Sequence, residues 1–372
     1  MSAASASSSP PTPRPETALF DFDDLEVQGG GVPVPVPVPA PPAPRKPAAM
    51  QSTPKAGPDF VNVRSLPALH ERRRAQALRH FLTFGAGNYQ ASALRLANEV
   101  RALGEAVFQE VHAFTELPES VAEDPRWERH TSGDTKGHGW WFWKSALVNF
   151  LLEEGTLRDG DTLAYGDAGC IVNWGSERAW LDLIQRVEDP QGVDLVAFQH
   201  EHLEKGYTKG DTFSHFGTRW DNADYGLTCQ CVGGYWVTRI NKRTRAFFAK
   251  WEELCANTSL ISDDPPTIIN PSFIANRHDQ SLLSMLVKSN KPVYERADDR
   301  HFNAGSREEA KSSSWRQPAA ERHRKFGVPD LKVVVLRDCG WPVTMDPSQP
   351  IAAARLNDSM LFSRGRSLEV CD

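Results

Sequence analysis

Short apolar runs typical of β-strands alternate with segments of helical periodicity along most of this chain, beginning near residue 79. The first run is HFLTF at 80–84, and a glycine turn separates it from a helical face that includes Leu94 and Leu103. The alternation extends to the strand pattern KPVYE at 291–295. This order predicts an α/β fold in which helices flank a mostly parallel sheet.

The remaining elements follow from the same two periodicities. Strands are expected at 106–114, 162–165, 193–200 and 331–342, and a strand pair or one long bent strand at 227–239. Helices are expected at 137–155, 176–189, 243–257 and 278–289. Ser176 is the expected N-cap of its helix, and Gly233 and Gly234 predict a bulge in their strand. Ligands bind such sheets at the carboxyl ends of the strands, so the turns at 85–87 and 166–167 are expected to open on one ligand-binding edge.

Composition divides the chain into a domain and flanking segments. The segment GGGVPVPVPVPAPPAPRKP at 29–47 is expected to be an extended polyproline II tether or a docking ligand for a partner. The expected parts are a disordered Pro-rich tail at 1–58, a lead-in at 59–78, the domain at 79–357 with a polar surface insertion at 303–330, and a C-terminal tail at 358–372.

Charge and composition argue against several classes of function. With 42 basic and 48 acidic residues the formal net charge is -6, so binding to nucleic acid through bulk charge is not expected. No run is long enough to span a membrane, and the N-terminal MSAASASSSPPTPRP lacks the apolar core of a secretory signal. The default expectation is a cytoplasmic protein, and six scattered cysteines fit a reducing compartment.

A lone acid, Asp167, follows the buried strand pattern in DTLAYGDAGC at 161–170. A carboxylate on such a turn needs a positive partner, because burying it alone is costly. It is either a helix cap or salt-bridge partner, or a ligand for Mg²⁺ or Mn²⁺, which prefer carboxylate oxygens and keep phosphate and water as further ligands. Gly169 would let a diphosphate approach the backbone closely.

Lys144 is expected on the first turn of the helix that precedes the Asp167 strand. An ammonium at this place suits a phosphate pocket, and a surface lysine beside a core of aromatic residues fits the sequence equally well. The neighbouring Trp140, Trp141 and Trp143 cannot all face inward on one helix. At least one of them is therefore expected in a cleft.

Two further segments carry candidate polar groups. His278, Asp279 and Gln280 lie at a loop-to-helix junction, where Asp279 caps the helix or the three groups orient a hydroxyl-bearing substrate. Lys209 lies in the glycine-containing loop YTKGDTF. This loop suits an anion-binding lid, and without further context it is more simply a solvated loop.

Taken in order, the blocks FLTFGAGNY, GHGWWFWK, LAYGDAGC, TKGD, RHDQSLLSML and PIAAAR resemble those of the GT-A nucleotide-sugar glycosyltransferases. They are similar, more narrowly, to transferases encoded beside bacterial capsule and lipopolysaccharide loci. The resemblance covers about residues 79–357. It implies a GT-A-like fold and transfer of a sugar from a UDP- or GDP-type donor to a hydroxyl acceptor such as a glycan, with Mn²⁺ or Mg²⁺ as cofactor.

The resemblance also implies roles for individual residues. Asp167 matches the first acid of the Asp-x-Asp metal motif, whose second acid position is Gly169 here, so another acid such as Asp161 or Asp279 would have to join the metal. Asp279 is also the candidate base for the acceptor hydroxyl, which makes Asp167 and Asp279 the expected catalytic residues. The expected donor-binding residues are Gly85, Gly87, Asn88, Tyr89, Lys144, Gly166, Gly169 and Lys209, and the expected acceptor-binding residues are Trp141, His278 and Gln280.

Two other functions remain open from the sequence. A non-catalytic relative of the transferases could bind a nucleotide sugar and act as an interaction protein, because Gly169 removes one metal ligand. A metal-dependent phosphoesterase is the other alternative, although such sites need several clustered acids or histidines and Asp167 stands alone.

Overall fold

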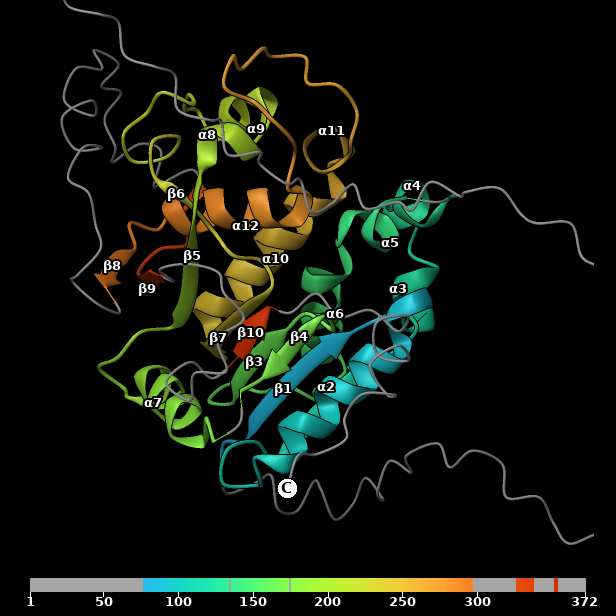
Figure 1. Cartoon of the computed structure of the whole chain (residues 1–372), viewed down its shortest axis with the longest axis vertical. Helices are drawn as coiled ribbons and strands as arrows, with labels where there is room; N and C mark the ends of the chain where they lie inside the picture. Colours follow the sequence, from blue (N-terminus) through green and yellow to red (C-terminus); the bar gives the residue numbers. More distant parts are fainter. Residues whose placement is uncertain (1–75, 134, 174, 297–325, 338–350, 354–372) are drawn as a thin grey trace, which may run out of the picture. The chain divides into compact units, whose positions relative to one another are not determined.

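The computed structural model describes residues 76–133, 135–173, 175–296, 326–337 and 351–353 (Figure 1). The predicted Pro-rich tail and its docking segment, most of the lead-in, most of the insertion and the C-terminal tail lie outside the described residues. Of the PIAAAR block, the described part is 351–353.

The main sheet has eight strands. They are β1 (Arg79–Phe84), β2 (Glu110–Phe114), β3 (Thr162–Gly166), β5 (Leu195–Leu203), β6 (Cys229–Cys231), β7 (Tyr235–Arg239), β8 (Val293–Arg296) and β9 (Val333–Arg337). Their order is β2-β1-β3-β7-β5-β9-β8, and β6 pairs with β5. A separate antiparallel ribbon joins β4 (Cys170–Val172) to β10 (Ile351–Ala353).

Four of the seven strand pairings in this sheet are parallel and three are antiparallel, so the expectation of a mostly parallel sheet is confirmed in part. β1 is parallel to β2 and β3, and β9 is parallel to β5 and β8, but β7 is antiparallel to both of its neighbours, β3 and β5. β6 also runs antiparallel to β5, because the chain reverses after β5 through two short helices, α8 (Glu204–Tyr207) and α9 (Gly210–His215), instead of crossing over. The sheet is therefore mixed, with helices flanking it.

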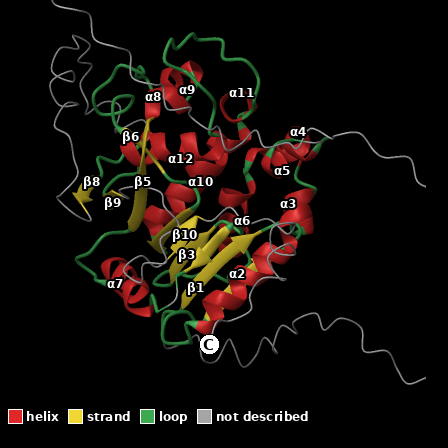
Figure 2. Ribbon diagram, in the orientation of Figure 1, coloured by secondary structure: helices red, strands yellow, loops and turns green. Residues whose placement is uncertain are grey.

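Five longer helices accompany the strands in the described chain. They are α2 (Gln90–Ala102), α6 (Trp143–Glu153), α7 (Glu177–Glu188), α10 (Lys242–Ala256) and α12 (His278–Lys288). The shorter ones are α3 (Glu119–Ala122), α4 (Glu128–Thr131), α5 (Gly137–Trp140), α11 (Thr258–Ile261) and the 3₁₀ turns η1 (Gly87–Tyr89) and η2 (Pro125–Trp127). Figure 2 shows how these helices surround the strands.

The helices form two hydrophobic layers, one on each face of the sheet. Successive strand side chains point to opposite faces, and the core follows that alternation. Leu163 and Trp236 belong to the cluster that contains residues of α6, α10 and α12. Their sequence neighbours Ala164 and Val237 belong to the cluster that contains residues of α2 and α7. The sheet is thus buried on both faces, as the apolar strand runs predict.

The predicted helix at 137–155 begins later than expected. His138, Trp140 and Trp141 have positive φ angles of 54°, 55° and 62°, which no α-helix accepts, so the long helix α6 begins at Trp143. Lys144 still lies on its first turn, as predicted. Among the three tryptophans, Trp141 is the partly exposed one, and Trp140 and Trp143 are buried.

The predicted N-cap of α7 is half confirmed. Ser176 occupies the N-cap position, but its side chain makes no capping hydrogen bond. The helix is held instead through its buried face, to which Trp180 and Ile184 belong. Within the described residues, no helix combines the length and apolar character that a membrane crossing requires.

Candidate active site

The end of β3 and the start of β7 meet because the two strands are antiparallel. Gly166, the last residue of β3, is paired with Tyr235, the first residue of β7. Asp167 follows directly, and its backbone N–H donates to the carbonyl oxygen of Gly234 at 2.8 Å. Gly233 and Gly234, predicted as a bulge within a strand, form instead the bend between β6 and β7, and this bend lies against the turn that carries the lone acid.

Lys144 brings three sequence-predicted residues together. Its ammonium lies 3.2 Å from Asp167 Oδ1 and 3.1 Å from Asp279 Oδ2, and it donates to the carbonyl oxygen of Gly233 at 3.2 Å. The side chains of Lys144 and Asp279 are 4% and 3% exposed, whereas that of Asp167 is 36% exposed. We call Lys144, Asp167 and Asp279 the charged cluster; Asp167 is the member that is accessible to solvent.

Burial and charge shift the protonation equilibria inside the charged cluster. Burial alone would lower the pKa of Lys144, but the carboxylates of Asp167 and Asp279 outweigh it and raise that pKa, so the ammonium stays charged. Burial raises the pKa of Asp279 to about 7, against the opposing attraction of Lys144. The charged cluster therefore carries a carboxyl group that titrates near neutral pH.

Tyr165 is a site residue that sequence analysis assigned only to the strand. Its hydroxyl donates to Asp167 Oδ1 at 2.5 Å, and its ring is fully buried. Burial raises the pKa of Tyr165 well above its usual value, so the hydroxyl remains a donor. The available signal was a tyrosine two residues before a lone acid, on the same side of an extended chain.

A second missed feature is an arginine clamp on the turn after Asp167. Arg95 on α2 donates to the carbonyl oxygens of Ala168 at 2.9 Å and of Cys170 at 2.5 Å. Its other branch pairs with Glu99 at 2.6 Å, and Glu99 accepts the backbone N–H of Val172 at 2.9 Å. We call Arg95 and Glu99 the α2 clamp. Their spacing of four residues on one helix was the visible signal.

Gln280 holds the bend at Gly233 and Gly234 through the backbone of Gly233. Its side-chain oxygen accepts the backbone N–H of Gly233 at 2.9 Å, and its amide nitrogen donates to Gln230 at 2.7 Å. Gln230 in turn donates to Glu204 at 2.9 Å, and Glu204 forms a fully buried ion pair with Lys288 at 2.6 Å. A continuous polar network thus extends from the sheet interior to the carbonyl that Lys144 contacts.

His278 and Trp141 lie side by side next to the charged cluster. Their ring centroids are 5.1 Å apart, and His278 has a positive φ of 52° at the start of α12. His278 Nε2 lies 2.8 Å from Asp263, which also accepts from the indole N–H of Trp140 at 3.1 Å. Asp263 is thus a further residue that the sequence motifs did not indicate.

The first glycine turn lies against the Asp167 turn, as its predicted place at the same edge requires. A Cβ atom on Gly85 would lie 2.2 Å from the carbonyl oxygen of Tyr89 and 3.1 Å from Ala168 Cβ, so only glycine fits there. Gly87 has a φ of +55° and is exposed, as are Asn88 and Tyr89.

The two glycines beside Asp167 differ in their surroundings. Gly166 is buried, and a Cβ atom there would lie 2.9 Å from Phe81 and 2.8 Å from Ile351. Packing therefore accounts for the glycine at 166. Gly169 is partly exposed on the turn between Asp167 and Cys170.

Lys209 is buried and does not lie on a solvated loop. It is the N-cap residue of α9, and its ammonium donates to the carbonyl oxygen of Ser259 at 3.1 Å. Burial lowers its pKa. Asp211 accepts the backbone N–H of Thr267 at 3.0 Å, which ties this segment to the loop before α12. Because the ammonium is anchored to the carbonyl oxygen of Ser259, the structure gives no support to the predicted role of Lys209 in donor binding.

Asp161 is excluded as a partner of Asp167. It precedes β3, at the opposite end of the strand, and accepts the backbone N–H groups of Leu78 and Arg158, each at 2.9 Å. Within the described residues no group of three or more His, Cys, Asp or Glu side chains could hold a metal ion. A divalent ion at this edge would depend on Asp167 and on oxygens supplied by a ligand or by water.

Comparison with known proteins identifies no family. No family model matches the chain, and no curated protein does. Among solved structures, it is similar to that of a glycosyltransferase involved in the glycosylation of the major capsid of PBCV-1. The two share 11% sequence identity with a TM-score of 0.31, over 67% of this chain and 98% of the other. This TM-score is too low to support an argument about fold or function.

Proposed function

We propose that this chain is a glycosyltransferase that moves a sugar from a nucleoside-diphosphate sugar to a hydroxyl acceptor. The observation that carries the proposal is the charged cluster, in which Lys144 joins Asp167 and Asp279 at the carboxyl end of β3. The glycine turn at 85–87 lies beside it, and Gly87 is exposed with open space around it. An α/β sheet places its ligands at this edge. The GT-A resemblance of the same segments supports this assignment.

Lys144 would act on the leaving group. Departure of a nucleoside diphosphate develops negative charge, and a fixed cation in a partly dry site stabilises that charge in the transition state. The Lys144 side chain is 4% exposed and its three donors are engaged by Asp167, Asp279 and the Gly233 carbonyl. Lys144 would therefore act as a fixed charge behind Asp167 and would not contact the diphosphate directly. Its raised pKa keeps it protonated throughout the neutral range.

Asp167 would hold the divalent ion. It is the partly exposed carboxylate of the cluster, and Mg²⁺ or Mn²⁺ in phosphate sites commonly takes one or two protein carboxylates and completes its shell with phosphate and water. The residues present fit that arrangement, with Asp167 as the protein ligand. When bound, the ion would supply further positive charge at the diphosphate.

The structure leads us to revise the role of Asp279. A base for the acceptor must reach the acceptor hydroxyl, and a carboxylate that is 3% exposed and lies 3.1 Å from Lys144 does not. We propose that Asp279 positions Lys144 instead. His278 and the partly exposed Trp141 then border the acceptor side, where an indole face can stack on a sugar. Gln280 would hold the Gly233 backbone.

A non-catalytic nucleotide-binding protein is the second candidate. When Asp279 is protonated, Lys144 balances the charge of Asp167, so the cluster could bind a diphosphate without activating any transfer. The phosphoesterase alternative loses support, because the described residues contain no group of three metal-binding side chains.

A thermal-shift panel separates these candidates. The purified chain would be mixed with UDP, GDP, CDP or their sugars, with Mn²⁺, Mg²⁺ or EDTA. A ligand at about 100 times its Kd should stabilise the fold by about 2.7 kcal/mol. The nucleotide that binds would then be tested for hydrolysis or transfer of its sugar. Binding with turnover supports the transferase, binding without turnover on any of several acceptors supports the second candidate, and no binding contradicts both.

A further inference from the structure

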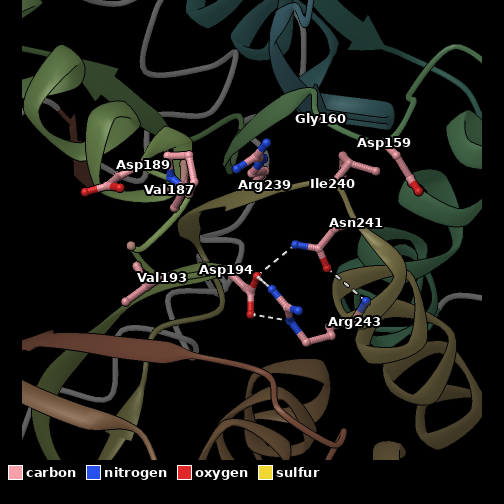
Figure 3. A pocket seen from close by; sticks show the side chains of 12 residues that line it. Asp159, Gly160, Val187, Asp189, Val193, Asp194, Arg239, Ile240, Asn241 and Arg243 are labelled. Carbon is pink, nitrogen blue, oxygen red and sulfur yellow. Dashed lines mark hydrogen bonds and ion pairs between the residues drawn. The ribbon is translucent and has the colours of Figure 1, made fainter.

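Two adjoining cavities lie at the sheet edge opposite the charged cluster. One has a volume of about 350 Å³ and the other about 490 Å³, and both are lined by Gly160 and Arg239. Gly160 precedes β3 and Arg239 is the last residue of β7. Both cavities therefore lie at the opposite end of these two strands from Asp167. Figure 3 shows the smaller one, with Arg239 apart from the hydrogen-bonded group of Asp194, Asn241 and Arg243.

The guanidinium of Arg239 makes few hydrogen bonds within the described residues. Its Nη1 donates one long hydrogen bond, of 3.4 Å, to the carbonyl oxygen of Glu188. A guanidinium offers five N–H donors in a planar fork that fits a carboxylate or a phosphoryl group. Within the described residues, no carboxylate pairs with Arg239.

The acidic residues around it are already engaged. The carboxylates that line the two cavities and pair with other arginines are Asp159 with Arg245 at 2.6 Å, Asp194 with Arg243 at 2.6 Å, and Glu188 with Arg79 at 2.7 Å. The fourth, Asp189, is exposed and accepts the backbone N–H of Gln191 at 2.8 Å. Arg239 therefore stands as the cation that both cavities share and that this part of the chain leaves without an ion pair.

The walls of the smaller cavity are partly apolar. Val187 and Ile240 contribute to its lining, together with Val193. We propose that the cavities form a binding site for a small organic anion, whose carboxylate or phosphoryl group is held by Arg239 and whose apolar part lies against these side chains. The site is independent of the proposed transferase function, because it shares no residue with the charged cluster.

The test compares the full chain with the variant Arg239→Gln, using inorganic phosphate and benzoate as probes. Each probe is titrated while the chemical shifts of backbone amides are followed by NMR. Arg178→Gln is the matched control, because Arg178 is an 86% exposed arginine whose ion pair with Asp182 lies within α7. We expect at least one probe to perturb amides around Gly160 and Arg239, with a Kd at least about tenfold weaker in Arg239→Gln and unchanged in Arg178→Gln.

The two probes also distinguish the ligand chemistry. Binding of benzoate alone assigns a carboxylate, binding of phosphate alone assigns a phosphoryl group, and binding of both assigns an anion site with mixed tolerance. The proposal is overturned if neither probe perturbs these amides, or if Arg239→Gln binds both as tightly as the unaltered chain. If phosphate binds, a selenate soak of crystals gives a second readout, in which an anomalous peak at the Arg239 guanidinium supports the site and peaks only elsewhere overturn it.

Discussion

The ammonium of Lys144 lies 3.1 Å from a carboxylate oxygen of Asp279, and both side chains are almost completely buried. A buried ion pair seldom adds net stability, because desolvation of the two charges offsets their attraction. In this chain the pair fixes an ammonium beside the partly exposed Asp167.

Replacing Lys144 should remove both stability and activity. Lys144→Met leaves two carboxylates facing each other without a cation, and we expect the free energy of unfolding at pH 8 to fall by about 2–4 kcal/mol. The double variant with Asp279→Asn should recover part of this loss, because the uncompensated buried charge is gone. Chemical denaturation of the unaltered chain, the two single variants and the double variant measures the interaction free energy between Lys144 and Asp279. If the losses of unfolding free energy in the single variants simply add in the double variant, the two residues do not interact.

Replacing Asp167 should abolish turnover and leave the fold intact. Asp167→Asn keeps the shape of the side chain and an oxygen for the Tyr165 hydroxyl, and Asp279 still pairs with Lys144, so we expect the free energy of unfolding to fall by no more than about 2 kcal/mol. Activity with the nucleotide sugar identified by thermal shift should become undetectable. Asp182→Asn on the exposed surface of α7 is the control, and full activity of Asp167→Asn would remove this acid from the mechanism.

Asp279 should make stability depend on pH in a defined direction. Burial raises its pKa to about 7, so between pH 4 and pH 7 the folded chain retains a proton that the unfolded chain has lost. The free energy of unfolding should therefore fall as pH rises through this window, by an amount on the order of 4 kcal/mol. Denaturation of Asp279→Asn in parallel isolates this contribution, and identical pH profiles would contradict it.

The same titration should affect binding of an anionic donor. Below pH 7 the cluster carries one positive and one negative charge, and above it ionised Asp279 adds a second negative charge. Affinity for the nucleoside diphosphate is expected to fall as pH rises through 7, and Asp279→Asn should lose this dependence.

The α2 clamp should act through Asp167. Arg95→Met removes two hydrogen bonds to the turn after Asp167, so we expect activity to fall at least about tenfold and stability by about 1–3 kcal/mol. Arg95→Lys should recover little activity, because an ammonium lacks the planar fork. The measurement that tests this route is nucleotide affinity in the double variant. When Asp167→Asn is already present, adding Arg95→Met should not lower the affinity further. Arg101→Met, on the same helix, is the control.

Gly234 should tolerate no side chain without loss of function. A Cβ atom there would lie 3.0 Å from Asp167 Oδ2, closer than ordinary contact, although the backbone conformation itself accepts alanine. We expect Gly234→Ala to displace the carboxylate and lower turnover about tenfold to a hundredfold. Gly206→Ala, whose nearest atom would be 3.4 Å away, is the matched control for steady-state kinetics. Equal rates in the two variants would contradict this placement of Asp167.

The positions of several candidate site residues could be predicted from local patterns. Asp167 does end a buried strand, and Lys144 does lie on the first turn of the preceding helix, because a strand of apolar residues and a helix of apolar periodicity are each encoded over a few neighbouring residues. The helix predicted at 278–289 is observed as α12, and its first residues lie at the site.

The partners of these residues could not be predicted in the same way. Apolar alternation determines which face of a strand is buried, but it carries no information on strand direction, so the antiparallel β7 was missed. The contact between Lys144 and Asp279 depends on how α6 and α12 pack on one face of the sheet. The prediction that Asp161 could join Asp167 as a metal ligand was wrong for a related reason. Asp161 precedes β3 and Asp167 follows it, and the opposite ends of one strand cannot meet.

The place of β7 in the sheet, between β3 and β5, has a consequence for synthesis of the protein. A ribosome completes β1, β2 and β3, with Lys144 and Asp167, long before it reaches Gly233 or Asp279. The bend at Gly233 and Gly234 reaches Asp167 only when β7 inserts beside β3, and the second carboxylate arrives with α12. Chains released before residue 279 thus lack the buried acid that holds Lys144, and premature termination yields products in which the cluster is never assembled.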